Sequence, residues 1–149
     1  MQRRCFVFIA LFGVVGCLKT GRTSIPYEES HYEREVAHEL APEVAFERVE
    51  GALARSYQDW PRLLETKDRK EGQLLLKPKV SYRTGGPMGT VHHAPYTLAI
   101  TVRKGTISLA FDLQKDPASD QWAPTEAIPY IRHDFDAVVS NVEDAVAPR

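Results

Sequence analysis

The side chains most able to take part in chemistry are His92 and His93, which stand next to each other in a glycine-rich segment, residues 84–95. Imidazoles bind metal ions and transfer protons near neutral pH. The composition of the segment predicts a loop, and only a contorted loop lets two adjacent imidazoles hold one ion, because neighbours on a strand point to opposite faces. His133 and Asp134 would have to add ligands through the fold, since no third ligand stands at a typical metal spacing. We therefore predict a solvated loop and no metal or other cofactor.

Other catalytic patterns are absent from the sequence or incomplete. The "HEL" at His38 is followed at once by Ala41 and Pro42, which excludes a helical zinc-protease motif. No GxSxG elbow or glycine-rich phosphate loop occurs. Two carboxylate pairs have the register of solvated helix faces: Asp134 with Asp136, and Glu143 with Asp144. We predict a protein that is not an enzyme. An envelope hydrolase built on the histidines and nearby acids is a further alternative, ranked third after the two binding functions given below.

The N-terminus has the layout of a secretory signal. Arg3 and Arg4 precede an apolar run over residues 6–15, which is shorter than the roughly 20 residues that a spanning helix needs. The run ends at Val14-Val15-Gly16-Cys17. We expect a signal peptide over residues 1–16 and a polar, flexible tether over residues 17–30.

These four residues resemble the lipobox of bacterial lipoproteins. The resemblance implies that the Cys17 thiol accepts a diacylglycerol, that cleavage falls between Gly16 and Cys17, and that the new amino terminus is acylated. A thiolate is the nucleophile that such a transfer requires. Leu18 stands where an aspartate would retain the protein in the inner membrane, so the resemblance implies an outer-membrane anchor with the domain facing the periplasm. The alternatives are an ordinary cleaved signal and a eukaryotic secretory leader with a chance cysteine.

Composition limits the remaining function classes. The chain has 19 Lys and Arg against 20 Asp and Glu, a net charge of −1, which argues against nucleic-acid binding. Both cysteines, Cys5 and Cys17, lie at the N-terminus, so the body has no disulfide. The domain, residues 31–149, must therefore be stabilised by its core.

One basic group suggests a partner. Lys70, Lys77, Lys79 and Arg83 fall on or near one predicted strand, and the last three share a face. Lysines on an exposed edge strand commonly prevent strands of other molecules from pairing with it. The alternative is contact with an anionic surface, such as lipid headgroups or lipopolysaccharide.

Apolar periodicity predicts the elements. Residues 31–40 alternate as a first strand or begin a helix, and Pro42 opens a helix that Pro61 ends. Two hairpins follow. The first turns at Gly72, with Pro78 forcing an edge or a bulge, and the second has strands over residues 96–102 and 107–113. A final helix buries Ile131, Phe135, Val138, Val142 and Val146. Trp122 is expected to fold onto the domain.

This order predicts an α+β, two-layer sandwich, with an antiparallel sheet of about four to five strands and a helix near each end. It resembles the helix-grip arrangement found in some outer-membrane assembly lipoproteins, including the BamC type. The resemblance covers about residues 34–147 and is carried by the element order and by "TKDRKEGQLLL" after the first helix.

The sequence thus predicts a lipid-anchored envelope protein whose domain binds another envelope protein. The alternative is a periplasmic module that holds a lipid or a small apolar ligand between the sheet and the last helix.

Overall fold

The computed structural model describes residues 25–148. The predicted leader, Gly16 and Cys17 at the predicted cleavage and acylation site, and the tether up to Ser24 lie outside these residues. Within the described range, no helix is both long enough and apolar enough to cross a membrane.

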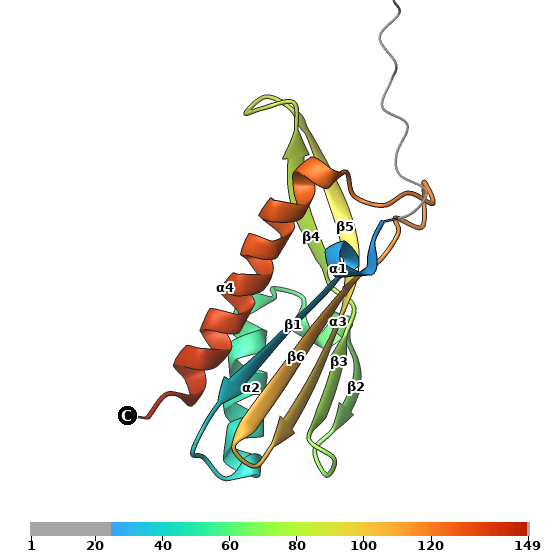
Figure 1. Cartoon of the computed structure of the whole chain (residues 1–149). Coiled ribbons are helices and arrows are strands. Elements are labelled where there is room, and N and C mark those ends of the chain that lie inside the picture. Colours follow the sequence, from blue (N-terminus) through green and yellow to red (C-terminus); the bar gives the residue numbers. More distant parts are fainter. Residues whose placement is uncertain (1–24, 149) are drawn as a thin grey trace, which may run out of the picture.

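The sheet has six antiparallel strands in the order β1-β6-β5-β3-β2, with β4 also paired to β5. The strands are β1 (His31–Ala37), β2 (Leu64–Asp68), β3 (Gln73–Leu76), β4 (Lys79–Thr84), β5 (Thr90–Arg103) and β6 (Thr106–Leu113). The helices are α1 (Tyr27–Ser30), α2 (Pro42–Ser56), α3 (Trp60–Leu63) and α4 (Ile128–Val146), which the 3₁₀ turn η1 (Thr125–Ala127) precedes. The predicted α+β class and antiparallel sheet are confirmed (Figure 1).

The strand count exceeds the prediction because one long strand is interrupted. β3 and β4 both pair with β5 in one continuous register, Leu76 opposite Leu98 and Lys79 opposite Pro95. Pro78 lacks an N–H and so breaks the ladder, although its carbonyl still accepts from the Tyr96 N–H at 3.0 Å. The predicted turn at Gly72 is confirmed, with a positive φ of 67°.

The two long helices pack on one face of the sheet and fill the core (Figure 1). The stripe predicted for the last helix is confirmed, since all five of its residues are buried on α4. On the sheet, Leu98 and Leu109 are fully buried. Phe135 of α4 stacks on Phe111 of β6, with ring centroids 4.5 Å apart.

The helix that begins at Pro42 ends earlier than the pattern predicted. α2 stops at Ser56 and Tyr57 is extended, with φ −123° and ψ 116°. This turn of the chain brings the Tyr57 hydroxyl to 2.7 Å from that of Tyr96 on β5. Pro61 therefore lies in the first turn of the short helix α3, which begins at Trp60, instead of ending α2, because proline suits the first helical turn.

The folded domain begins before His31. Ile25 packs against the core, and Tyr27 of α1 stacks on the His31 ring at 4.6 Å. His31 is positioned to donate from Nδ1 to Asp112 at 2.5 Å and from Nε2 to Glu33 at 3.0 Å. Residues 25–30, assigned to the tether from sequence, thus belong to the domain.

The His31 contacts predict a pH dependence of stability. The hydrogen bond with Asp112 raises the pKa of His31, with a smaller contribution from Glu33, and this effect exceeds the opposing effect of burial. A raised folded pKa means that the stabilisation is complete below the unfolded pKa of about 6.5 and is lost as the pH rises through the folded value. We expect a loss of less than about 1 kcal/mol, because Asp112 is partly exposed.

Urea denaturation at a series of pH values measures this effect. The His31→Gln variant should lack the decline on the basic side, whereas His93→Gln should keep it. If the stability of His31→Gln declined with rising pH as much as that of wild type, the dependence would belong to another group.

Candidate functional site

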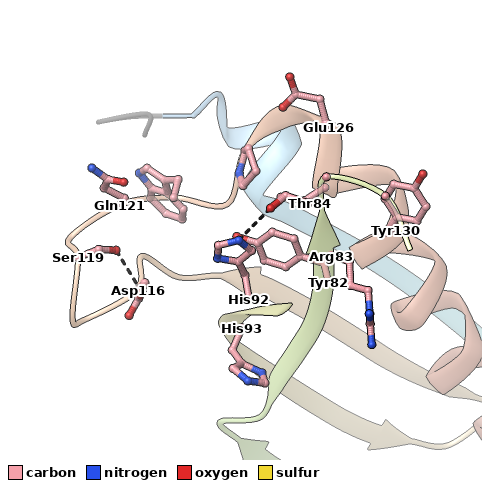
Figure 2. Close-up of a pocket in the computed structure, with 15 residues that line it drawn as sticks. Tyr82, Arg83, Thr84, His92, His93, Asp116, Ser119, Gln121, Glu126 and Tyr130 are labelled. Carbon is pink, nitrogen blue, oxygen red and sulfur yellow. Dashed lines mark hydrogen bonds between the residues drawn. The ribbon is translucent and has the colours of Figure 1, made fainter. Parts of the chain in front are cut away.

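A cleft of about 710 Å³ opens at the end of the sandwich where α4 begins. Three segments far apart in the chain form its walls: the β4–β5 hairpin, the loop after β6, and the start of α4 (Figure 2). The interrupted strand creates this space, because β4 and the first half of β5 project beyond β2, β3 and β6.

Aromatic rings form much of the cleft surface. Tyr82 and His92 are directly opposite on β4 and β5, and their rings stack with centroids 5.4 Å apart and planes 20° from parallel. Trp122 adds a half-buried indole, and Tyr130 on α4 is 69% exposed. Burial raises the pKa of Tyr82, so its phenol is a neutral hydrogen-bond donor at physiological pH.

The position of the His92 ring is fixed from both sides. Its Nε2 lies 2.9 Å from the Thr84 hydroxyl, and its face rests against Tyr82. The dashed line in Figure 2 marks the contact with Thr84. A ring held in this way is preorganised for stacking and loses little side-chain entropy when a ligand binds.

The loop after β6 is ordered by Asp116. Its carboxylate accepts from the Ala118 N–H at 2.9 Å and from the Ser119 hydroxyl at 3.1 Å. Its backbone N–H bonds to the Gln121 carbonyl at 2.8 Å, which closes the loop. The same segment continues to Trp122, which lines the cleft together with His92.

The prediction that His92 and His93 lie in a loop is wrong. Both are on β5, because pairing with β4 continues to Thr84 opposite Thr90 and leaves only residues 85–89 for the turn. As neighbours on a strand they point to opposite faces (Figure 2), and the Nδ1 of His93 lies 3.0 Å from the Ser81 hydroxyl.

His92 and His93 do not share a site with His133 and Asp134, the other possible ligands considered from sequence. His133 and Asp134 line a different hollow, beside Pro87 and Val91. Among residues 25–148, no three His, Cys, Asp or Glu side chains are placed to share a metal ion.

The predicted basic group is divided by the fold. Lys77, Lys79 and Arg83 follow one another on the outer side of β3 and β4, but Lys77 forms an ion pair with Glu65 at 2.8 Å. Lys70 lies at the β2–β3 turn, at the end opposite the cleft (Figure 1). Arg83 reaches the β4–β5 turn, where it donates to the Pro87 carbonyl at 2.9 Å.

The interior between the centre of the sheet and α4 is filled. Tyr96, Phe111 and Phe135 pack together there with centroids 4.5–6.1 Å apart. Burial raises the pKa of Tyr57 to about 12 and also raises that of Tyr96, so their paired hydroxyls stay neutral. These rings occupy most of the space under the middle of the last helix, where the sequence suggested a ligand site, and a hollow of about 290 Å³ remains beside Tyr57, Tyr96 and Val138.

Sequence reasoning missed most of the cleft. Tyr82 packs against the core from β4, but nothing local relates it to Trp122 or Tyr130. The useful signal was the tryptophan in a polar, proline-containing loop, since such a large ring is seldom left free in solvent.

Comparisons with known proteins identify the fold. No family model matches the chain, and no curated protein matches it by sequence. A TBP-like protein from Parabacteroides distasonis matches 76% of this chain and 92% of its own, with a TM-score of 0.54 and 13% identity. A DUF4468 family protein from Bacteroides ovatus matches 85% of this chain and 92% of its own, with a TM-score of 0.56 and 7% identity. At these identities the likeness concerns the fold alone.

Proposed function

We propose that this chain is a lipid-anchored, non-catalytic binding module of the bacterial cell envelope. Residues 1–16 direct it out of the cytoplasm, and acyl chains on Cys17 hold it at a membrane, most simply the outer one. The lipobox-like Val14-Val15-Gly16-Cys17 and the short apolar run before it support this location. Two or three acyl chains anchor a protein stably, whereas one gives only marginal binding.

The aromatic cleft carries the binding part of the proposal. Its volume of about 710 Å³ lies in the range of small-molecule sites, and Tyr82, His92 and Trp122 offer flat apolar surfaces. Ring surfaces that are already fixed in place favour a ligand with its own ring or a flat apolar part. Gln121 and Glu126 line the rim and provide polar groups for polar substituents.

The occupant is therefore an amphipathic ligand and not a purely apolar chain. The cleft is open to solvent, so the aromatic side chain of another envelope protein fits the same chemistry, in line with the partner expected from the sequence. Either occupant uses the same residues, and an experiment on those residues tests the site before the ligand is known.

Binding of the dye 1-anilinonaphthalene-8-sulfonate tests the cleft, because the dye combines a flat aromatic part with a charged group. We expect saturable binding of about one dye per protein, weakened roughly tenfold by Trp122→Ala, a loss of about 1.4 kcal/mol. Tyr27→Ala removes an exposed aromatic ring that lies on α1, outside the cleft, and should leave binding unchanged.

The native occupant can then be identified by displacement. A solvent extract of the cell envelope should release the dye if the ligand is small, and the protein fraction should release it if the ligand is a partner. Equal dye binding by wild type and Trp122→Ala, at matched folding by circular dichroism, would contradict the assignment of the cleft.

A further inference from the structure

The β4–β5 turn presents an apolar side chain to solvent on a rigid support. Met88 is 97% exposed at the end of the hairpin. Gly85 and Gly86 have positive φ values of 84° and 79°, and a Cβ on Gly89 would lie 1.7 Å from the Thr84 carbonyl oxygen. The turn therefore requires its glycines and holds Met88 outward.

Met88 is not isolated, because apolar neighbours continue the surface. Val91 is 46% exposed and Tyr130 is 69% exposed, and both border the hollow that Pro87 lines. We call Pro87, Met88, Val91 and Tyr130 the apolar tip. A contiguous apolar surface at the end of a molecule marks an interaction site more often than single exposed residues do.

The charges around the apolar tip suit an anionic surface. Arg83 donates to the Pro87 carbonyl at 2.9 Å and so holds its guanidinium at the base of the turn. The sequence contains no Asp or Glu between Glu71 and Asp112, a stretch that includes all of β4 and β5, and Asp134 of α4, next to His133, is the carboxylate that lines the hollow beside Pro87 and Val91. Basic groups beside an apolar surface attract anionic headgroups.

The chain enters the domain in the half that carries the apolar tip. The helix α1, which precedes β1, lies on the side of β1 toward the first turn of α4, away from the β5–β6 turn (Figure 1). The eight residues from Cys17 to Ser24 span at most about 29 Å when fully extended. An acylated Cys17 therefore keeps this half of the domain close to the bilayer.

We propose that the apolar tip inserts into the headgroup region of the phospholipid bilayer to which the protein is anchored. This inference rests on the proposed acylation of Cys17. Met88 and Pro87 enter the interface, Tyr130 lies at headgroup level as tyrosines commonly do, and Arg83 contacts phosphate. The domain is then oriented with its ligand cleft facing along the membrane, and it is not free to rotate on its tether.

Fluorophore depth measurements test the insertion on the full-length protein purified from bacterial membranes. In Met88→Cys the new thiol is the only free one once Cys5 has left with the leader and the Cys17 sulfur carries lipid. It is labelled with the dye NBD and reconstituted into phosphatidylethanolamine–phosphatidylglycerol vesicles. Lys104→Cys, at the β5–β6 turn on the opposite end, is the matched control. The mass of each sample reports acylation.

We expect NBD at position 88 to shift to the blue and to be quenched severalfold more by nitroxide-labelled lipids than NBD at position 104. Acylated samples in which both positions are quenched equally would overturn the insertion and leave the anchor standing. Samples without acyl chains would overturn the anchor and this inference together, whereas the dye-binding result for the cleft would be unaffected.

Discussion

Replacing Cys17 with serine is expected to abolish maturation completely. Wild type should be recovered with a mass that corresponds to residues 17–149 plus two or three acyl chains. The variant should lack the acyl mass and retain residues 1–16, because the lipobox resemblance makes cleavage dependent on acylation of the thiol, and a serine hydroxyl is a far weaker nucleophile at neutral pH. The measurement is intact-mass analysis of the membrane fraction.

Cys5→Ser is the matched control for this change. Cys5 lies in the predicted signal peptide, so its substitution should leave the mature mass unaltered. A wild-type protein with a bare Cys17 thiol, or one cut at another residue, would refute the anchor. The orientation proposed for the domain would then lose its premise.

Removing the ring of Phe135 is expected to cost about 3–5 kcal/mol of stability. Phe135 is 3% exposed and contacts the rings of Phe111 and Tyr96 at centroid distances of 4.5 and 4.7 Å. Phe135→Ala leaves a cavity among these rings, which the continuous strands β5 and β6 cannot close by moving. The loss is a large part of the 5–15 kcal/mol typical of a whole domain.

Urea denaturation followed by circular dichroism measures this loss. Tyr130→Ala on the same helix is the control, because that ring is largely exposed and its removal should change the free energy of unfolding by less than about 0.5 kcal/mol. If Phe135→Ala lowered the free energy of unfolding no more than Tyr130→Ala, the result would contradict the packing of α4 against the sheet. Since the cleft walls are held by the same packing, dye binding should weaken as the variant unfolds.

The anchor, the cleft and the apolar tip give a consistent picture of the proposed module. The cleft and the apolar tip belong to the half of the molecule in which the described chain begins. The opposite half, with the β2–β3 and β5–β6 turns, carries Lys70 and Lys104. A ligand would therefore be held near the membrane surface, where amphipathic molecules of the envelope are concentrated.

The sequence by itself determined the local elements, because their signals are local. The step of three and four from Ile131 to Val146 specified α4, and alternation over residues 96–102 and 107–113 specified the central hairpin, since helix and strand periods depend only on neighbouring residues. Gly72 specified its turn through the backbone freedom that a positive φ requires. The lipobox-like ending of the leader is likewise a local pattern, and it remains a prediction.

Only the tertiary structure decided where those elements end and what they enclose. His92 and His93 belong to β5 because β4 pairs with that segment, and no residue near them in the sequence indicates this pairing. The cleft exists because three separate segments bring Tyr82, Trp122 and Tyr130 to its walls. Contacts of this kind depend on the register of strands and on the packing of the whole core, and such long-range geometry is not encoded in the spacing of neighbouring residues.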